Sequence, residues 1–196
     1  MEHLLRQWVL GGDWRGPVML GLLLCLAALT GEAAAQAPAL KTVAQVDVKR
    51  YLGKWYEIAS IPASFQKACV GGTTATYTLR PDNTVEVLNQ CYDREGRLKS
   101  AKGRAWVIDP ATNAKLKVSF IPFLRLSFLA GDYWIIDLGP DYEYAVVGHP
   151  SREYGWILSR TPELPPATLE GINQRLKAQG YDPADFKMTD QKRLAP

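Results

Sequence analysis

Short segments that alternate apolar and polar residues recur along the chain from residue 53 onward, and this pattern is typical of β-strands. Turn-forming residues separate the segments, for example at 81–83 (PDN) and 109–113 (DPATN). The pattern predicts eight strands, at residues 54–60, 73–80, 84–91, 100–108, 115–120, 132–138, 142–148 and 154–160. Residues 186–188 could add a short ninth strand.

The periodicity changes near the C-terminus. Within residues 165–179, Leu169, Ile172 and Leu176 recur at helical spacing, and Gly180 suits the end of a helix. Because the eight preceding segments are joined by hairpin-length connections, we expect an all-β fold, an eight-stranded antiparallel up-and-down barrel. The predicted C-terminal helix would pack on the outside of this barrel.

An eight-stranded barrel is either filled by its own side chains or encloses one small ligand. In the segment 100–108, Lys102 and Arg104 occupy one set of alternate positions, and Ala101, Gly103 and Ala105 occupy the other. Charged side chains must face water, so the small residues face inward and leave space. The pattern therefore favours a cavity over a filled core.

Residues 1–37 have the composition of a signal peptide. An apolar run at 18–29 (VMLGLLLCLAAL) is shorter than the roughly 20 residues that span a bilayer. Small residues follow it, and we expect cleavage after Ala35 or Ala37, which leaves residues 38–196 as a single domain. An uncleaved membrane anchor is the alternative interpretation.

Export decides how the cysteines are interpreted. Cys25 lies in the middle of the apolar run, so we assign it to the signal peptide, with a lipidated N-terminal cysteine as the alternative. Cys69 and Cys91 remain, and an even number of cysteines in an exported chain indicates a disulfide. In the register of the predicted hairpin at 73–91, the two lie close enough for a bridge. Two free buried thiols are the alternative.

Composition and charge narrow the class of function. The chain has 23 Lys and Arg against 20 Asp and Glu, a net charge of +3, without the clustered basic face of a nucleic-acid-binding protein. Its two histidines and three cysteines argue against most zinc sites and against a histidine-based catalytic triad. A Gly-x-Ser-x-Gly nucleophile motif is absent from the sequence. We therefore expect no enzyme activity, no metal, no cofactor and no nucleic-acid partner.

Four segments of the chain resemble the lipocalin family. Residues 51–59 (YLGKWYEIA) contain a Gly-x-Trp motif like that of the first lipocalin strand. Residues 74–77 (TATY) resemble the second strand of the bacterial outer-membrane lipocalins. Residues 131–137 (GDYWIID) and 156–160 (WILSR) resemble two further conserved regions, the last of which ends in arginine. The resemblance covers about residues 47–190 and implies the barrel fold.

The resemblance also implies structural roles for Gly53, Trp55 and Arg160. Trp55 would close the floor of the barrel, and the Arg160 guanidinium would lie across its ring. Such a cation–π contact stabilises a fold by about 1–2 kcal/mol when it is desolvated.

The same resemblance implies the function of an exported carrier in the periplasm, with association with the outer membrane as a further expectation. It would hold a fatty acid or lysophospholipid in the barrel and serve cell-envelope lipid maintenance. The candidate ligand-binding residues are those of inward parity together with aromatic residues of the strands: Glu57, Ala59, Ala75, Tyr77, Val87, Asn89, Ala105, Leu116, Val118, Phe120, Tyr142, Tyr144, Tyr154 and Trp156. Aromatic walls can hold an acyl chain while a hydroxyl or indole N–H meets a polar head.

Glu57 and His149 are the remaining polar residues to interpret. Glu57 could meet a ligand headgroup, but we favour hydrogen bonds to protein groups near the floor of the barrel. His149 lies beside Pro150 in a predicted turn, so we assign it no role. For the whole chain, a barrel enzyme acting on a lipid and a ligand-free interaction module are the alternatives to a carrier.

Residues 120–129 (FIPFLRLSFL) are strongly apolar although they connect two predicted strands. Connecting loops are usually polar because they run over the surface. We interpret this segment as an exposed lip at the barrel mouth, where Phe123, Leu124, Leu126 and Phe128 contact a membrane surface or a partner. An inward-folded tip is the alternative, and either a monomer or a homodimer is compatible with the sequence.

Overall fold

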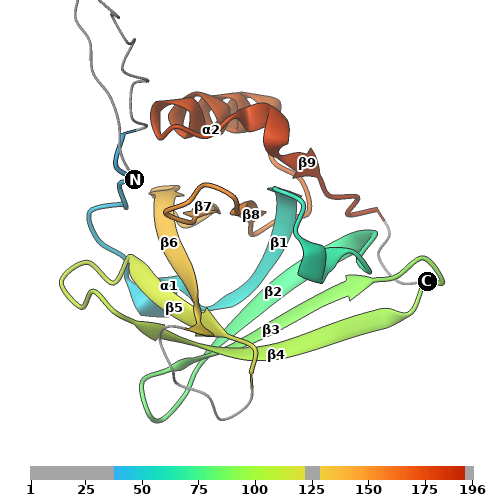
Figure 1. Ribbon diagram of the computed structural model, residues 1–196, viewed down its shortest axis with the longest axis horizontal. Helices are drawn as coiled ribbons and strands as arrows, with labels where there is room; N and C mark the ends of the chain where they lie inside the picture. The colour runs from blue at the N-terminus through green and yellow to red at the C-terminus, as the bar shows by residue number, and fades with distance from the viewer. Residues whose placement is uncertain (1–37, 122–128, 193–196) are drawn as a thin grey trace, which may run out of the picture. The chain divides into compact units, whose positions relative to one another are not determined.

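A single antiparallel sheet closes on itself to form a barrel (Figure 1). The computed structural model describes residues 38–121 and 129–192. The strands from β2 to β8 pair with one another in chain order. β1 pairs with both β8 and β2, which closes the barrel. The eight strands are β1 (Gly53–Ser60), β2 (Gly71–Leu79), β3 (Val85–Tyr92), β4 (Leu98–Val107), β5 (Lys115–Ser119), β6 (Gly131–Leu138), β7 (Tyr144–Gly148) and β8 (Gly155–Ser159). They confirm the eight predicted segments.

Helix α2 (Pro166–Ala178) confirms the predicted C-terminal helix. It packs across the outer side of the barrel, over β1 and β6 to β8 (Figure 1). Its residues Ile172 and Leu176 are fully buried against outward-facing residues of these strands, among them Ile58, Val146 and Ile157. The strands under α2 are therefore apolar on both faces.

The C-terminal segment returns to the barrel after α2. It forms the 3-10 helix η3 (Pro183–Asp185) and the strand β9 (Lys187–Met188), which is the predicted short ninth strand. β9 pairs with β1 at Ala59 and Ser60. This pairing places residues 189–191 beside the first strand of the barrel.

Besides η3, two other short helices of the described residues were not predicted from the sequence. The helix α1 (Val48–Tyr51) precedes β1, and the Asp47 carboxylate accepts hydrogen bonds from two of its backbone N–H groups. The 3-10 helix η1 (Ser64–Gln66) lies in the loop that follows β1. Both helices have a single turn, which is too short to show a helical period in the sequence.

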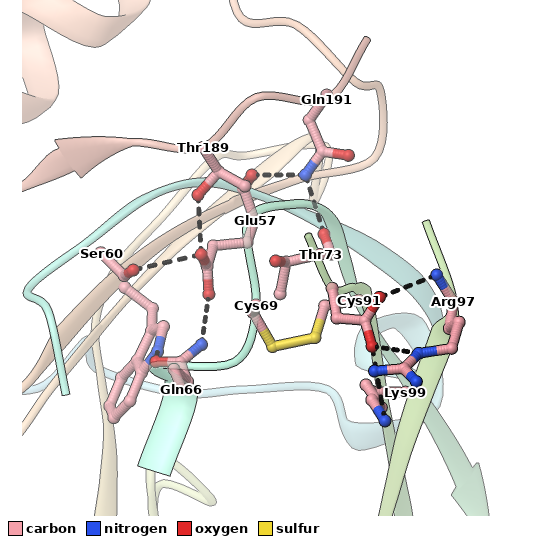
Figure 2. The surroundings of a disulfide bond; sticks show 12 residues. Glu57, Ser60, Gln66, Cys69, Thr73, Cys91, Arg97, Lys99, Thr189 and Gln191 are labelled. Atoms are coloured by element: carbon pink, nitrogen blue, oxygen red, sulfur yellow. Dashed lines mark hydrogen bonds and ion pairs between the residues drawn. A yellow bond between two sulfur atoms is a disulfide. The ribbon is translucent and has the colours of Figure 1, made fainter. Parts of the chain in front are cut away.

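The predicted disulfide is confirmed. Cys69 and Cys91 are bonded, with their Cα atoms 5.5 Å apart, and the bridge ties the loop after η1 to β3 (Figure 2).

In the described part of the chain, none of the helices combines the length and the apolar character needed to span a bilayer. The predicted signal peptide, residues 1–37, lies outside the described residues.

Candidate ligand cavity

The barrel encloses a cavity of about 720 Å³, within the usual range for small-molecule sites. At one end it is bounded by residues of α1, and at the other it reaches Phe65, Phe120 and Leu129, which are 68%, 42% and 53% exposed. The walls between are mainly apolar and include Val85, Val87, Ala105, Leu116, Val118, Ile135 and Leu158. The cavity therefore has a closed end at α1 and an open end beside exposed side chains.

Most of the residues expected to face a ligand line this cavity, namely Glu57, Ala75, Tyr77, Val87, Asn89, Ala105, Leu116, Val118, Phe120, Tyr154 and Trp156. Strict alternation along β3, β4 and β5 explains why the sequence located Val87, Asn89, Ala105, Leu116 and Val118. The buried Oδ1 of Asn89 has no hydrogen-bond partner among the described residues. Contact of these residues with a ligand remains a prediction.

Three of the expected positions lie outside the cavity. A β-bulge between Glu57 and Ala59 reverses the alternation of β1, so Ala59 faces the helix α2 instead of the interior. Tyr144 also lies on the outer face, where its hydroxyl accepts a hydrogen bond from Arg175 Nη2 at 2.9 Å. Tyr142 precedes β7 in a turn with φ of 60°, and its hydroxyl accepts from the Asp47 N–H at 2.8 Å.

The closed end has the contact that the lipocalin resemblance implied. The Arg160 guanidinium lies 3.7 Å from the centre of the Trp55 ring, and Trp55 is 0% exposed. Arg160 also donates hydrogen bonds to the carbonyl oxygens of Lys54, at 2.9 Å, and Arg50, at 2.7 Å. Gly53 has a φ of 92°, a conformation that glycine adopts without steric cost, so the backbone can turn from α1 into β1 here.

Three tyrosine hydroxyls meet toward the closed end of the cavity. The Tyr133 hydroxyl lies 2.8 Å from that of Tyr51 and 2.9 Å from that of Tyr77, and all three residues line the cavity. Burial raises the pKa of Tyr77 to about 12 and raises the pKa values of Tyr51 and Tyr133 well above 10.0. The hydroxyls therefore stay protonated at physiological pH, and they form the main polar feature of this end.

Glu57 is buried and hydrogen-bonded to protein groups, as expected, but those groups are not at the floor (Figure 2). Its carboxylate accepts from Thr189 Oγ1 at 2.7 Å, Gln66 Nε2 at 3.0 Å and Ser60 Oγ at 3.1 Å. The Gln191 amide also donates to the Glu57 backbone carbonyl, at 2.7 Å. Glu57 thus joins β1 to the first loop and to the C-terminal segment.

Comparison with known proteins decides the family. Residues 46–191 match the lipocalin-like domain family. The chain belongs to the lipocalin family. This lipocalin is 41% identical over 160 residues to temperature-induced lipocalin-1 of Arabidopsis thaliana, a match that covers 80% of this chain and 86% of the relative. It is 37% identical over 164 residues to the outer membrane lipoprotein Blc of Vibrio cholerae, covering 82% and 91% of the two chains.

Solved structures support the fold of this lipocalin. Insecticyanin from the tobacco hornworm Manduca sexta superposes with a TM-score of 0.63 at 23% sequence identity, covering 79% of this chain and 86% of that one. At this identity the likeness shows the fold alone. Lipocalins as a family bind small hydrophobic ligands, and the apolar cavity of this chain has the corresponding position inside the barrel.

At the open end of this lipocalin, the sequence identified Tyr154 and Trp156 but not Phe65, His149 and Asp132. The ring of Tyr154 lies between those of Phe65 and Trp156, with ring centres 6.0 Å and 6.4 Å away. His149, which was assigned no role, lines the cavity, and its Nε2 lies 3.8 Å from Asp132 Oδ2. Asp132 lies at the start of β6 and His149 directly follows β7, so the register of the β6–β7 hairpin is the signal that could have placed them together.

The expected lip residues Phe123, Leu124, Leu126 and Phe128 lie outside the described residues. The residues that flank them, Ile121 and Leu129, are described, are exposed and line the open end of the cavity. Within residues 38–121 and 129–192, no three His, Cys, Asp or Glu side chains gather closely enough to hold a metal ion.

Proposed function

We propose that this lipocalin is an exported carrier that holds a fatty acid or a lysophospholipid in its barrel. The cavity of about 720 Å³, apolar along its walls and reaching exposed side chains at one end, carries this proposal. Transfer of an acyl chain from water to such walls is favourable by about 25 cal/mol per Å² of apolar surface. Because the walls are already formed, little ordering opposes binding. The mechanism is passive and includes no covalent step.

The proposed location is the periplasm, with association with the outer membrane, and the proposed role is maintenance of envelope lipids. The signal-peptide pattern of residues 1–37 supports export. The Vibrio cholerae relative is named an outer membrane lipoprotein, which supports the same compartment for this chain.

We further propose that the open end contacts a membrane surface. Phe65, Phe120, Ile121 and Leu129 are large apolar side chains that are exposed beside the cavity. Grouped exposed apolar residues mark interaction surfaces, and a membrane is the source of the proposed ligand. Replacing Ile121 and Leu129 with serine should reduce co-sedimentation with phospholipid vesicles. Unchanged co-sedimentation would contradict the membrane contact and leave the carrier proposal intact.

Native mass spectrometry of the gently purified protein, followed by titration with a fluorescent fatty acid, tests the carrier function. We expect a co-purified lipid and saturable uptake of the probe. The substitution Ala105→Phe places a ring in the cavity, because Ala105 is buried and lines its wall. It should weaken uptake severalfold. Ala167→Phe, on the exposed side of α2, is the matched control.

Three results would refute the proposal. A barrel that carries no lipid and takes up no probe would be a ligand-free interaction module. Equal uptake by the Ala105→Phe and Ala167→Phe variants would place the bound probe outside the cavity. Turnover of the bound lipid would indicate the alternative of a barrel enzyme.

A further inference from the structure

The hydroxyl groups of Tyr51, Tyr77 and Tyr133 have three O–H protons, but only two hydrogen bonds join them. Each neutral phenol has one O–H to donate. Two hydrogen bonds join the three groups, with Tyr133 in the middle, and either atom of each pair could be the donor. These contacts use two of the three protons. Among the described residues no other acceptor lies within hydrogen-bond distance of the group, so one O–H is left to donate.

The surplus proton faces the cavity and not the protein. All three side chains line the cavity, and the Tyr51 ring also packs 5.0 Å from the buried ring of Trp55 at the closed end. A bound molecule that fills this end must displace any water that accepts the proton. A ligand with only C–H groups here would leave a buried donor unpaired, which is unfavourable.

The side chains around the three tyrosine hydroxyls indicate which charge the ligand group that binds there should have. The neighbouring side chains of the cavity are apolar, among them Val85, Leu116 and Ile135. Burial raises the pKa of all three tyrosines. It outweighs the Arg160 guanidinium, which lowers the pKa of Tyr51 and Tyr77, so the net effect of this region is to disfavour negative charge. A carboxylate would meet the same cost, whereas an uncharged carbonyl accepts a hydrogen bond without it.

We propose that the three tyrosine hydroxyls form a subsite for an uncharged oxygen acceptor, such as the carbonyl of a ketone, ester or amide, at the deep end of the ligand. The proposal rests on the carrier function of the barrel but not on a fatty acid or lysophospholipid as its ligand, because the methyl end of an acyl chain at this position would leave the donor unpaired. A ligand of this class enters with its carbonyl first and leaves its apolar part along the walls of the barrel. It thereby differs from a fatty acid bound with its carboxylate at the mouth.

Competition against the uncharged fluorescent probe N-phenyl-1-naphthylamine tests the subsite. The competitors are 2-nonanone, nonane and nonanoate, which share a nine-carbon chain. The variant replaces all three tyrosines with phenylalanine, Tyr51→Phe, Tyr77→Phe and Tyr133→Phe. Removing both partners of a buried hydrogen bond with little change of shape is nearly neutral for stability, so the variant should fold. Tyr144→Phe, on the outer face, is the control.

We expect the triple variant to bind 2-nonanone about tenfold more weakly than the wild type, and nonane equally or more tightly. The Tyr144→Phe control should match the wild type for both. Equal changes for 2-nonanone and nonane would overturn the subsite. A larger loss for nonanoate than for 2-nonanone would overturn its preference for an uncharged group. If the wild type takes up neither probe nor competitor, the carrier function fails, and the subsite fails with it.

Infrared spectroscopy of carbonyl-labelled 2-nonanone gives a second measurement that needs only the wild type. A hydrogen bond from a tyrosine lowers the carbonyl stretching frequency of the bound ketone below its value in hexane. The triple variant should return it to the hexane value. A hexane-like frequency in the wild type would overturn the proposal even if the triple variant does not fold.

Discussion

Arg160 holds three segments of the closed end together, and we expect Arg160→Ala to destabilise the barrel by about 3–4 kcal/mol. Its guanidinium lies 3.7 Å from the centre of the Trp55 ring and donates to the carbonyls of Arg50, Lys54 and Tyr142. The ring contact contributes about 1–2 kcal/mol. Each hydrogen bond contributes about 0.5–1.5 kcal/mol, and partial exposure favours the lower part of that range.

A lysine at the same position separates charge from geometry. The ammonium of Arg160→Lys keeps the charge but is not planar, and it can reach one of the three carbonyls at a time. We expect a loss of about 2 kcal/mol, from two hydrogen bonds and part of the ring contact. A double-mutant cycle with Trp55→Phe should give a coupling energy of about 1 kcal/mol for the stacked pair.

Urea unfolding measures these losses of stability. Circular dichroism is the signal, because Trp55→Phe changes the tryptophan fluorescence. The midpoint should fall at constant m value, with the disulfide intact. Lys102→Ala, at an exposed position of β4, is the control and should lie within about 0.5 kcal/mol of the wild type. If Arg160→Ala behaves like this control, or if Arg160→Lys equals the wild type, the closed end does not depend on the guanidinium.

Three further predictions concern the loops at the open end. Replacing Cys69 and Cys91 with serine opens a link across 22 residues and should cost about 3 kcal/mol in urea unfolding. Loss of hydration raises the pKa of Asp93, but the backbone N–H and guanidinium of Arg97 outweigh it and lower this pKa from 3.8 to about 2. Because the folded value lies below the unfolded one, this carboxylate stabilises the protein above about pH 4, and the stabilisation disappears as the pH falls through about 2. Glu57→Leu leaves three partly buried donors without their acceptor and should cost about 3 kcal/mol, with a smaller loss for Glu57→Gln.

Each of these predictions has a contradicting result. An unchanged urea midpoint in the double serine variant would show that the bridge does not constrain the unfolded chain. For Asp93, acid titration of the Asp93→Asn variant should lack the loss of stability between about pH 4 and pH 2, and a titration identical to the wild type would contradict the pairing. Equal stability of Glu57→Leu and the wild type would mean that the C-terminal segment is held by other contacts.

The sequence determined the order and type of the elements. Alternation in β3, β4 and β5 identified the cavity walls, because one face of these strands meets water and the other does not. The cysteine pair could be predicted for a similarly local reason, since a hairpin register fixes which residues lie opposite each other. The Gly-x-Trp motif and Arg160, which directly follows β8, indicated the closed end.

Only the tertiary structure decided that Tyr51 and Tyr133 face the cavity and that Tyr142 and Tyr144 do not. β7 is buried on both faces because α2 covers its outer side, so hydrophobicity could not place Tyr144. The bulge in β1 moved Ala59 outward, and no composition signal marks a bulge of this kind. The hydroxyl group of Tyr51, Tyr77 and Tyr133 joins α1, β2 and β6, and closure of the barrel brings them together. Sequence patterns report the neighbours of a residue along its own element, whereas the polar chemistry of this cavity depends on contacts between elements far apart in the chain.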